Sequence, residues 1–289
     1  MSIVTSQQLT RYYEQYKSTD VTFNKQVVAG LGLVAKGVYL KIQDRQIPCM
    51  VFSSSMSSAR VLAVMPAGVM LALKQANNRL TMHWCFKLPE KMDPITFFVT
   101  CRAAGFTPYG AQGPDVYFVS LDFTQRPADD LILLLGSLLE ANANARRRKD
   151  ERIVLTPETI KKLGLGSRDA ELVVGTASFK CVLRDISFSG AKVAVSGSEE
   201  TFKNRSVSLK LTLSEELREM TSPAAVRRVE EIGGRKDILA VSMEYSSDPP
   251  MSYKLLINSY LSATKKTAET GTGASTPPGS LATSPGADG

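Results

Sequence analysis

Two short segments of this sequence carry side chains that could bind a charged ligand. The first, Arg148-Lys-Asp-Glu-Arg152, places two guanidinium groups four positions apart, directly after Arg146 and Arg147. The second, Asp185-Ile-Ser-Phe-Ser-Gly190, offers a carboxylate, hydroxyl groups and a glycine within six residues. Guanidinium groups form forked, charge-assisted hydrogen bonds with anionic oxygens, and glycine permits a positive φ or a close backbone approach. Together, the two segments could hold an anion against a polar turn.

Each segment alone has a more ordinary interpretation. A basic run that follows a helix is usually a solvated helix end. An Asp-x-Ser-x-x-Gly sequence between two strands is usually a turn in which the Asp and Ser side chains satisfy backbone donors. The functional interpretation therefore depends on the two segments occurring together and on the elements that position them.

The residues around both segments predict a β domain. Period-two alternation of apolar residues, clearest in Val207–Leu213, indicates half-buried strands. The predicted strands are Glu171–Gly175, Phe179–Leu183, Ala191–Val195, Val207–Leu213, Ala225–Ile232 and Ile238–Tyr245. Thr156–Gly164 predicts a short inserted helix, because it has an N-cap threonine, a proline at the first helical position and a glycine after the last turn. Pro250–Lys266 predicts a closing helix.

A second β pattern precedes the basic run. Its predicted strands are Val38–Ile42, Ile47–Phe52, Arg60–Val64, Leu80–Phe86, Ile95–Cys101 and Val116–Phe123, with short helices over Ser6–Lys17 and Ala67–Gln75. Pro127–Ala145 predicts a linker helix that opens on a proline and two acids. Because Leu131–Leu139 is apolar around most of the helix, we expect that helix to be buried between or across domains.

These patterns predict a mainly β protein of two small antiparallel six-stranded barrels, joined by a helical linker and followed by a C-terminal helix. The expected domains are an N-terminal barrel over residues 1–126, a linker helix and basic connector over 127–147, and a second barrel over 148–264. Residues 265–289 are rich in Gly, Ser, Thr and Pro and are expected to form a disordered tail.

The two motifs, in this order within such a domain, resemble the PilZ family, in which they form the binding site for the second messenger cyclic di-GMP. The resemblance covers Arg146 to about Tyr245 and the closing helix. It implies that Arg148 and Arg152 bind phosphate and guanine, while Asp185, Ser187 and Gly190 form the opposing floor. Arg147 is then an expected further contact that can influence how many ligand molecules bind, and Arg146 is a candidate auxiliary.

The chemistry of the ligand fits these residues. Cyclic di-GMP carries two phosphates and two guanines, and guanidinium groups can bind phosphate oxygens, bind the O6/N7 edge of guanine and stack on base faces. The Asp185 carboxylate can accept hydrogen bonds from guanine N1–H and N2–H₂, and Ser187 can add a polar contact. The inserted helix Thr156–Gly164 departs from the family pattern, but it lies away from both motifs.

The whole chain also resembles the two-barrel PilZ receptors of spirochaetes, whose N-terminal domain is itself a degenerate PilZ-like barrel. Neither motif occurs before residue 146, so the first barrel is not expected to bind the ligand in this way. We expect ligand binding to order the connector Arg146–Arg152 and to fix the domain arrangement. The output would be recognition of a protein partner, with motility or the flagellar machinery favoured by the resemblance.

Composition limits the alternatives. A hydrophobic fraction of 43% and a charged fraction of 22% are typical of a folded protein, and a net charge of +7 is a mild basic bias. Cys49, Cys85, Cys101 and Cys181 form no C-x-x-C pair and are expected to be reduced thiols in strands. His83 is the only histidine, which disfavours a metal site and His-based catalysis.

We therefore expect no catalytic residues, no metal and no cofactor other than the ligand itself. No signal peptide or membrane span is recognisable, so the predicted location is the cytoplasm. Three alternatives remain: a nucleic-acid-binding protein that uses the basic connector, an enzyme, and a PilZ adaptor that has lost its ligand. The intact motifs argue against the adaptor, and the lack of aromatic residues near the connector argues against nucleic acid.

Overall fold

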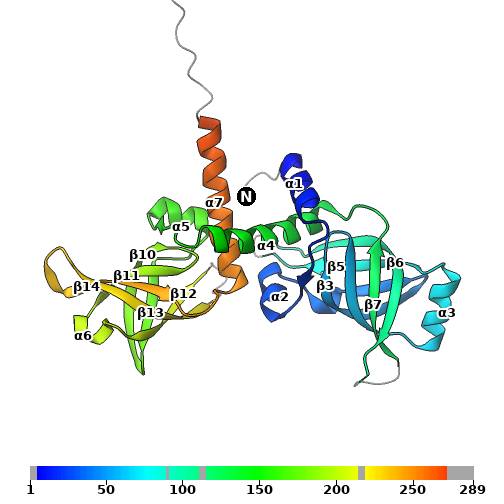
Figure 1. The fold of residues 1–289 in the computed structure, drawn as a ribbon, viewed down its shortest axis with the longest axis horizontal. Coiled ribbons are helices and arrows are strands. Elements are labelled where there is room, and N and C mark those ends of the chain that lie inside the picture. Colours follow the sequence, from blue (N-terminus) through cyan, green and yellow to red (C-terminus); the bar gives the residue numbers. More distant parts are fainter. Residues whose placement is uncertain (1–4, 89–90, 111–114, 214–218, 272–289) are drawn as a thin grey trace, which may run out of the picture.

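The computed structural model describes residues 5–88, 91–110, 115–213 and 219–271. Figure 1 shows two β-barrels at opposite ends of the molecule, with helix α4 between them and helix α7 beside the second barrel. Six strands close each barrel, and a seventh strand of two residues pairs with the last residues of one of them. The predicted fold class is thus confirmed.

The first barrel closes because β4 pairs with both β3 and β7. Its strands are β1 (Val21–Thr22), β2 (Tyr39–Ile42), β3 (Arg45–Ser54), β4 (Ser58–Val64), β5 (Arg79–Phe86), β6 (Ile95–Pro108) and β7 (Val116–Phe123). Its helices are α1 (Ser6–Tyr16), α2 (Lys25–Leu31), the 3₁₀ turn η1 (Ala35–Gly37) and α3 (Ala67–Gln75).

The second barrel closes in the same way, because β11 pairs with both β10 and β14. Its strands are β8 (Ile153–Val154), β9 (Asp169–Val174), β10 (Ala177–Ile186), β11 (Gly190–Ser196), β12 (Ser206–Thr212), β13 (Glu219–Ile232) and β14 (Arg235–Tyr245). Its helices are α5 (Pro157–Leu163), α6 (Glu199–Phe202) and α7 (Met251–Gly271), and α4 (Asp129–Arg147) joins the two barrels.

The two barrels follow the same chain path. The strand order β1-β3-β2-β5-β6-β7-β4 is repeated as β8-β10-β9-β12-β13-β14-β11. The first halves match with a constant offset of 132 residues, since Val21 pairs with Ser54 and Ile153 pairs with Ile186. Helices α2 and α5 match as well: each begins at a polar N-cap and ends at a glycine in the left-handed region, Gly32 or Gly164. The molecule therefore contains one barrel design twice.

Apolar side chains alternate along the strands and fill each barrel. Strands β3 and β10 have the same sequence of buried and exposed positions, including a bulge one residue after Val51 in β3 and after Leu183 in β10. The first core contains the fully buried Trp84, and the second contains Phe202. Cys49, Cys85, Cys101 and Cys181 are buried and unpaired with one another, as predicted.

Helix α4 packs against α1 and α7, between the two domains as expected, but it is fully buried on one side only, since Leu133, Leu134 and Leu139 are partly exposed. The contact with α7 is polar. The Asn144 amide donates to the Asn258 side-chain carbonyl at 2.6 Å, and the Asn258 amide donates to the Glu140 carboxylate at 3.3 Å. Lys254 of α7 donates to the Asn142 side chain at 3.2 Å. Helix α7 also contributes apolar side chains to both cores, Met251 to the first and Tyr253, Ile257 and Leu261 to the second, so these hydrogen bonds add to an apolar connection between the barrels.

The sequence analysis missed or shortened several elements. Helices α2 and α6 were not predicted, because seven and four residues carry too little periodicity to be recognised. Helix α7 continues to Gly271, so the predicted disordered tail begins too early. Helix propagation adds one hydrogen bond per residue once a packed first half has nucleated the helix. Residues 272–289 of that tail lie outside the described residues.

Candidate functional site

The basic segment lies at the junction of α4 and the second barrel. Arg146 and Arg147 form the last turn of α4, and Arg148 is its C-cap residue, whose N–H donates to the Asn144 carbonyl at 2.8 Å. A further turn follows, in which the Glu151 N–H donates to the Arg148 carbonyl at 3.0 Å, and β8 begins at Ile153. The two motif arginines therefore stand at the two ends of a defined turn.

The Asp185–Gly190 segment is the turn between β10 and β11, and its polar groups bond within the turn. The Ser187 N–H donates to the Gly190 carbonyl at 2.8 Å, and the Gly190 N–H donates to the Ser187 hydroxyl at 3.1 Å. Ser187 is only 1% exposed. Its hydroxyl group therefore shapes the turn from inside the protein.

Gly190 is required by a close backbone approach. A Cβ atom at this position would lie 2.1 Å from the carbonyl oxygen of Met243 in β14. The backbone of Gly190 does not have a positive φ. Of the two roles that the sequence allowed for this glycine, the structure thus shows the close approach.

Main-chain and side-chain contacts bring the two segments together. The Ser189 N–H donates to the Lys149 carbonyl at 3.0 Å, and the Ser189 hydroxyl donates to the Asp150 carboxylate at 3.0 Å. Strand β8 pairs with the end of β10, where Val154 lies opposite Asp185. Arg152 then forms an ion pair with Asp185 across the strands. The structure thus assembles residues that are 33 positions apart into one polar surface.

Both motif arginines are paired with carboxylates. Arg148 forms a bidentate ion pair with Glu151, and Arg152 pairs with Asp185. The Arg148 side chain is 15% exposed, whereas that of Arg152 is 47% exposed. Arg146 and Arg147 are exposed on the last turn of α4 and form no ion pair with any residue that the structure describes. Of the four arginines, two are therefore unpaired among the described residues and two are paired with carboxylates of this chain.

Two buried tyrosines form a chain of hydrogen bonds that ends at a backbone carbonyl of this turn. The Tyr253 hydroxyl of α7 donates to the Ser187 carbonyl at 2.9 Å, and the Tyr245 hydroxyl of β14 donates to the Tyr253 hydroxyl at 3.1 Å. Burial raises the pKa of both phenols, that of Tyr245 to about 12 and that of Tyr253 well above 10. Sequence reasoning did not find these tyrosines, nor Ser189 and Asp150, because no local pattern connects them to the motifs.

The first barrel repeats the turn without the charges. The Ser55 N–H donates to the Ser58 carbonyl at 2.9 Å, and the Ser58 N–H donates to the Ser55 hydroxyl at 3.0 Å, which reproduces the bonds of Ser187 and Gly190. At the offset of 132 residues, Asp20 stands where the second barrel has Arg152, and Tyr16 stands where it has Arg148. An anion would therefore meet a carboxylate at that position instead of a guanidinium group.

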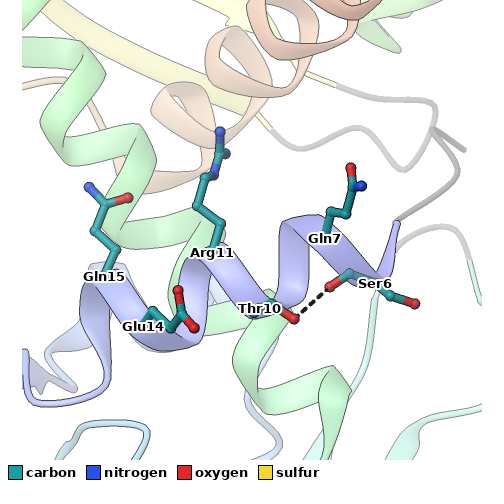
Figure 2. Close-up of a pocket in the computed structure, with 6 residues that line it drawn as sticks. All are labelled: Ser6, Gln7, Thr10, Arg11, Glu14 and Gln15. Carbon is teal, nitrogen blue, oxygen red and sulfur yellow. Dashed lines mark hydrogen bonds between the residues drawn. The ribbon is translucent and has the colours of Figure 1, made fainter.

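Other surface features do not form a competing site. Figure 2 shows an open hollow lined by Ser6, Gln7, Thr10, Arg11, Glu14 and Gln15, all from α1. Its one cation, Arg11, is bound to Glu140 of α4 at 2.7 Å, so the hollow is a product of helix packing. Among the described residues, no three His, Cys, Asp or Glu side chains are grouped to hold a metal ion. None of the described helices is long and apolar enough to cross a membrane.

Comparison with known proteins assigns a family to each half of the chain. Residues 7–142 match the PilZN3 domain, and residues 146–263 match the PilZ domain. A protein of Treponema denticola, named "Cyclic di-GMP binding protein", is 35% identical over 274 residues, which is 94% of this chain and 87% of that protein.

Solved structures that match the chain include Borreliella burgdorferi PlzA in complex with c-di-GMP. It is 19% identical, with coverage of 88% of this chain and 98% of that chain and a TM-score of 0.40. Escherichia coli YcgR in complex with c-di-GMP is 12% identical, with coverage of 85% and 91% and a TM-score of 0.29.

The buried tyrosines predict a loss of stability at high pH. Tyr245 must stay protonated in the folded protein, since its pKa there is about 12 against 10.0 for a free phenol. The free energy of unfolding should therefore fall as the pH rises from 10 to 12, by about 2–3 kcal/mol from this group. Tyr245→Phe should lose about 1 kcal/mol at pH 8 but should fall less steeply above pH 10. Urea denaturation at both pH values measures this, and parallel losses in the two proteins would contradict it.

Proposed function

Because the chain belongs to the PilZ family, with a PilZN3 domain followed by a PilZ domain, we propose that it is a cytoplasmic receptor for cyclic di-GMP. The observation that carries the proposal is the position of Arg148 and Arg152 beside the Asp185 turn. Two guanidinium groups next to a carboxylate match the phosphates and the guanine edge of this ligand. The name of the Treponema denticola relative supports the same ligand.

The site residues then divide into two groups. Arg148 and Arg152 would bind phosphate and guanine, and Asp185 would accept hydrogen bonds from guanine N1–H and N2–H₂. Ser187 and Gly190 are buried, so their role would be to hold the turn that presents Asp185. Exposed Arg147, with Arg146 beside it, would add a further phosphate contact. No catalytic group and no metal are part of this proposal.

Binding would require an exchange of partners. In this structure Arg148 forms an ion pair with Glu151, and Arg152 forms an ion pair with Asp185. A phosphate that reaches Arg148 must displace the Glu151 carboxylate, and a guanine that reaches Asp185 must separate it from Arg152. The internal carboxylates thus act as weak competitors of the ligand, since ion pairs at a protein surface are worth only about 0–1 kcal/mol.

The output would be a change in domain arrangement. The basic segment begins on α4, whose side chains Asn142 and Asn144 bond to α7 of the second barrel. These hydrogen bonds can rearrange at lower cost than the apolar contacts that α7 makes with the two cores. We propose that drawing Arg147 and Arg148 onto the ligand changes the end of α4 and, with it, the relative position of the barrels. A partner in the motility machinery would then recognise the new arrangement.

The first experiment is isothermal titration of the full chain with cyclic di-GMP. Arg148→Ala removes charge-assisted hydrogen bonds worth about 1.5–3 kcal/mol, so binding should weaken about 10- to 150-fold. Arg235→Ala, at the first residue of β14, should leave the affinity unchanged. If the wild type showed no saturable binding at about 100 µM ligand, the receptor assignment would be wrong and the adaptor or nucleic-acid functions would replace it.

Glu151→Gln tests the exchange of partners. Because the neutral amide releases Arg148 without changing the size of the side chain, the affinity should increase about two- to fivefold. The control is Glu158→Gln, an exposed acid in the first turn of α5 that pairs with no described arginine. The same titration measures both variants. Weaker binding by Glu151→Gln would show that Glu151 supports the site instead of competing for it.

Small-angle scattering tests the change in domain arrangement. Profiles of the full chain with and without saturating cyclic di-GMP should differ in radius of gyration, and Arg148→Ala should remove the difference at the same ligand concentration. Identical wild-type profiles, in the presence of binding by titration, would reject the rearrangement while leaving the receptor function intact.

A further inference from the structure

Exposed apolar side chains gather on the first barrel. Among the described residues, the exposed large hydrophobic side chains are Met50, Phe52, Val64, Leu71, Met92 and Phe98 in the first barrel, but only Val154 and Val182 in the second. Three of them share one outer face: Met50 and Phe52 alternate on β3, and Val64 lies on β4. The β3–β4–β7 face is defined here by Met50, Phe52, Arg60, Leu62, Val64 and Phe118.

The strand register joins these residues into one surface. Met50 lies opposite Leu62 on β4, and Leu62 lies opposite Phe118 on β7. Their chain neighbours Val51, Val61 and Val119 point into the core, with at most 5% exposure. By the two-residue period of a strand, the six residues of the face point outward.

The second barrel provides an internal control for this face. Its matched positions are Val182, Arg184, Lys192, Ala194, Ser196 and Ala240, because the paired strands superimpose by register. Where the first barrel carries Phe52, Leu62 and Val64, the second carries arginine, alanine and serine. The barrel design itself therefore does not require an apolar exterior at these positions, and contiguous exposed apolar surface is typical of a contact site.

A basic side chain lies in the middle of the face. The Arg60 guanidinium lies 4.4 Å from the ring centre of Phe118 and 5.5 Å from that of Phe52. Phe118 also meets Phe52 and Tyr109 edge to face, at 5.1 and 5.2 Å between ring centres. The rings are thus packed against one another and under Arg60, which leaves them poorly placed to stack on nucleobases. Arg60 forms no ion pair with a described residue, so its donors remain available to a carboxylate.

The net charge of the first barrel favours an acidic partner over a second copy of this chain at the β3–β4–β7 face. Residues 1–126 contain 13 Lys and Arg against 7 Asp and Glu, whereas residues 127–289 contain 22 against 21. The first barrel therefore carries almost all of the net charge of +7. Two copies of this basic barrel would repel each other face to face, and an acidic partner would be attracted.

We propose that the β3–β4–β7 face is a docking surface for a protein partner that presents aliphatic side chains around an Asp or Glu residue. The partner's apolar side chains cover Met50, Leu62 and Val64, and its carboxylate binds the Arg60 guanidinium. The surface lies entirely on strands of the first barrel, so this inference does not depend on the function proposed above.

The test is photo-crosslinking in the cells from which the gene comes. p-Benzoylphenylalanine replaces Met50 or Val64 in the full chain, and Val182 or Ser196 at the matched positions of the second barrel as controls. The crosslinked protein is identified by mass spectrometry and purified. Its binding is then measured by titration against the wild type, Arg60→Glu, Val64→Glu and Lys192→Glu, the last of which changes the residue that matches Arg60 in the second barrel. Circular dichroism establishes that each variant is folded.

The proposal predicts one protein adduct from positions 50 and 64 that is missing from positions 182 and 196. The purified protein should bind the wild type, and Arg60→Glu and Val64→Glu should each weaken that binding at least tenfold, whereas Lys192→Glu should not. The proposal is overturned if neither position gives an adduct, or if the adduct is nucleic acid or a second copy of this chain. Binding that ignores both substitutions on the face would overturn it equally.

Discussion

The hydrogen bond from the Tyr253 hydroxyl to the Ser187 carbonyl lies inside the second barrel, and three parts of the molecule meet there. Ser187 holds the turn that presents Asp185, Tyr245 of β14 donates its hydroxyl to Tyr253, and Tyr253 belongs to the helix that contacts α4. A buried carbonyl group without this donor would be costly, because a lost partner leaves its desolvation uncompensated. The turn is therefore attached to α7, and α7 in turn contacts α4, the helix that joins the two barrels.

The two barrels share one backbone fold but differ in the chemistry of their solvent-facing residues. In both barrels a serine forms the same two hydrogen bonds across the turn that follows the bulged strand: Ser55 with Ser58 in the first, and Ser187 with Gly190 in the second. The positions that face solvent differ: the second barrel has guanidinium groups beside its turn, while the first has an apolar face around Arg60. The buried residues determine the barrel fold, so the solvent-facing residues of the two barrels can differ without changing that fold.

The sequence predicted the strands well because barrel strands alternate with a period of two and are bounded by turn residues, as in Val207–Leu213. It predicted through a family resemblance that the basic segment and the Asp185 turn belong together. The domain matches confirm the resemblance. It could not show that Ser187 is buried, since the motif alone does not say which side of the turn faces the core. Nor could it find Tyr253, which is 66 residues from the serine it holds, or the pairing of Glu151 with Arg148. The Tyr253 contact depends on barrel closure, which is not a local property of the chain, whereas the Arg148–Glu151 pair is local and depends on the turn between α4 and β8.

The core of the first barrel has a consequence for the order of synthesis. It includes Leu131, Leu135 and Leu138 from α4 and Met251 from the start of α7, where the Met251 side chain lies against Gly30 of α2. N-terminal domains generally fold first as a chain leaves the ribosome. Here the chain must grow past both barrels before the last apolar group of the first core is available. The core of the first barrel therefore gains its last apolar side chain from α7, the last helix of the described residues.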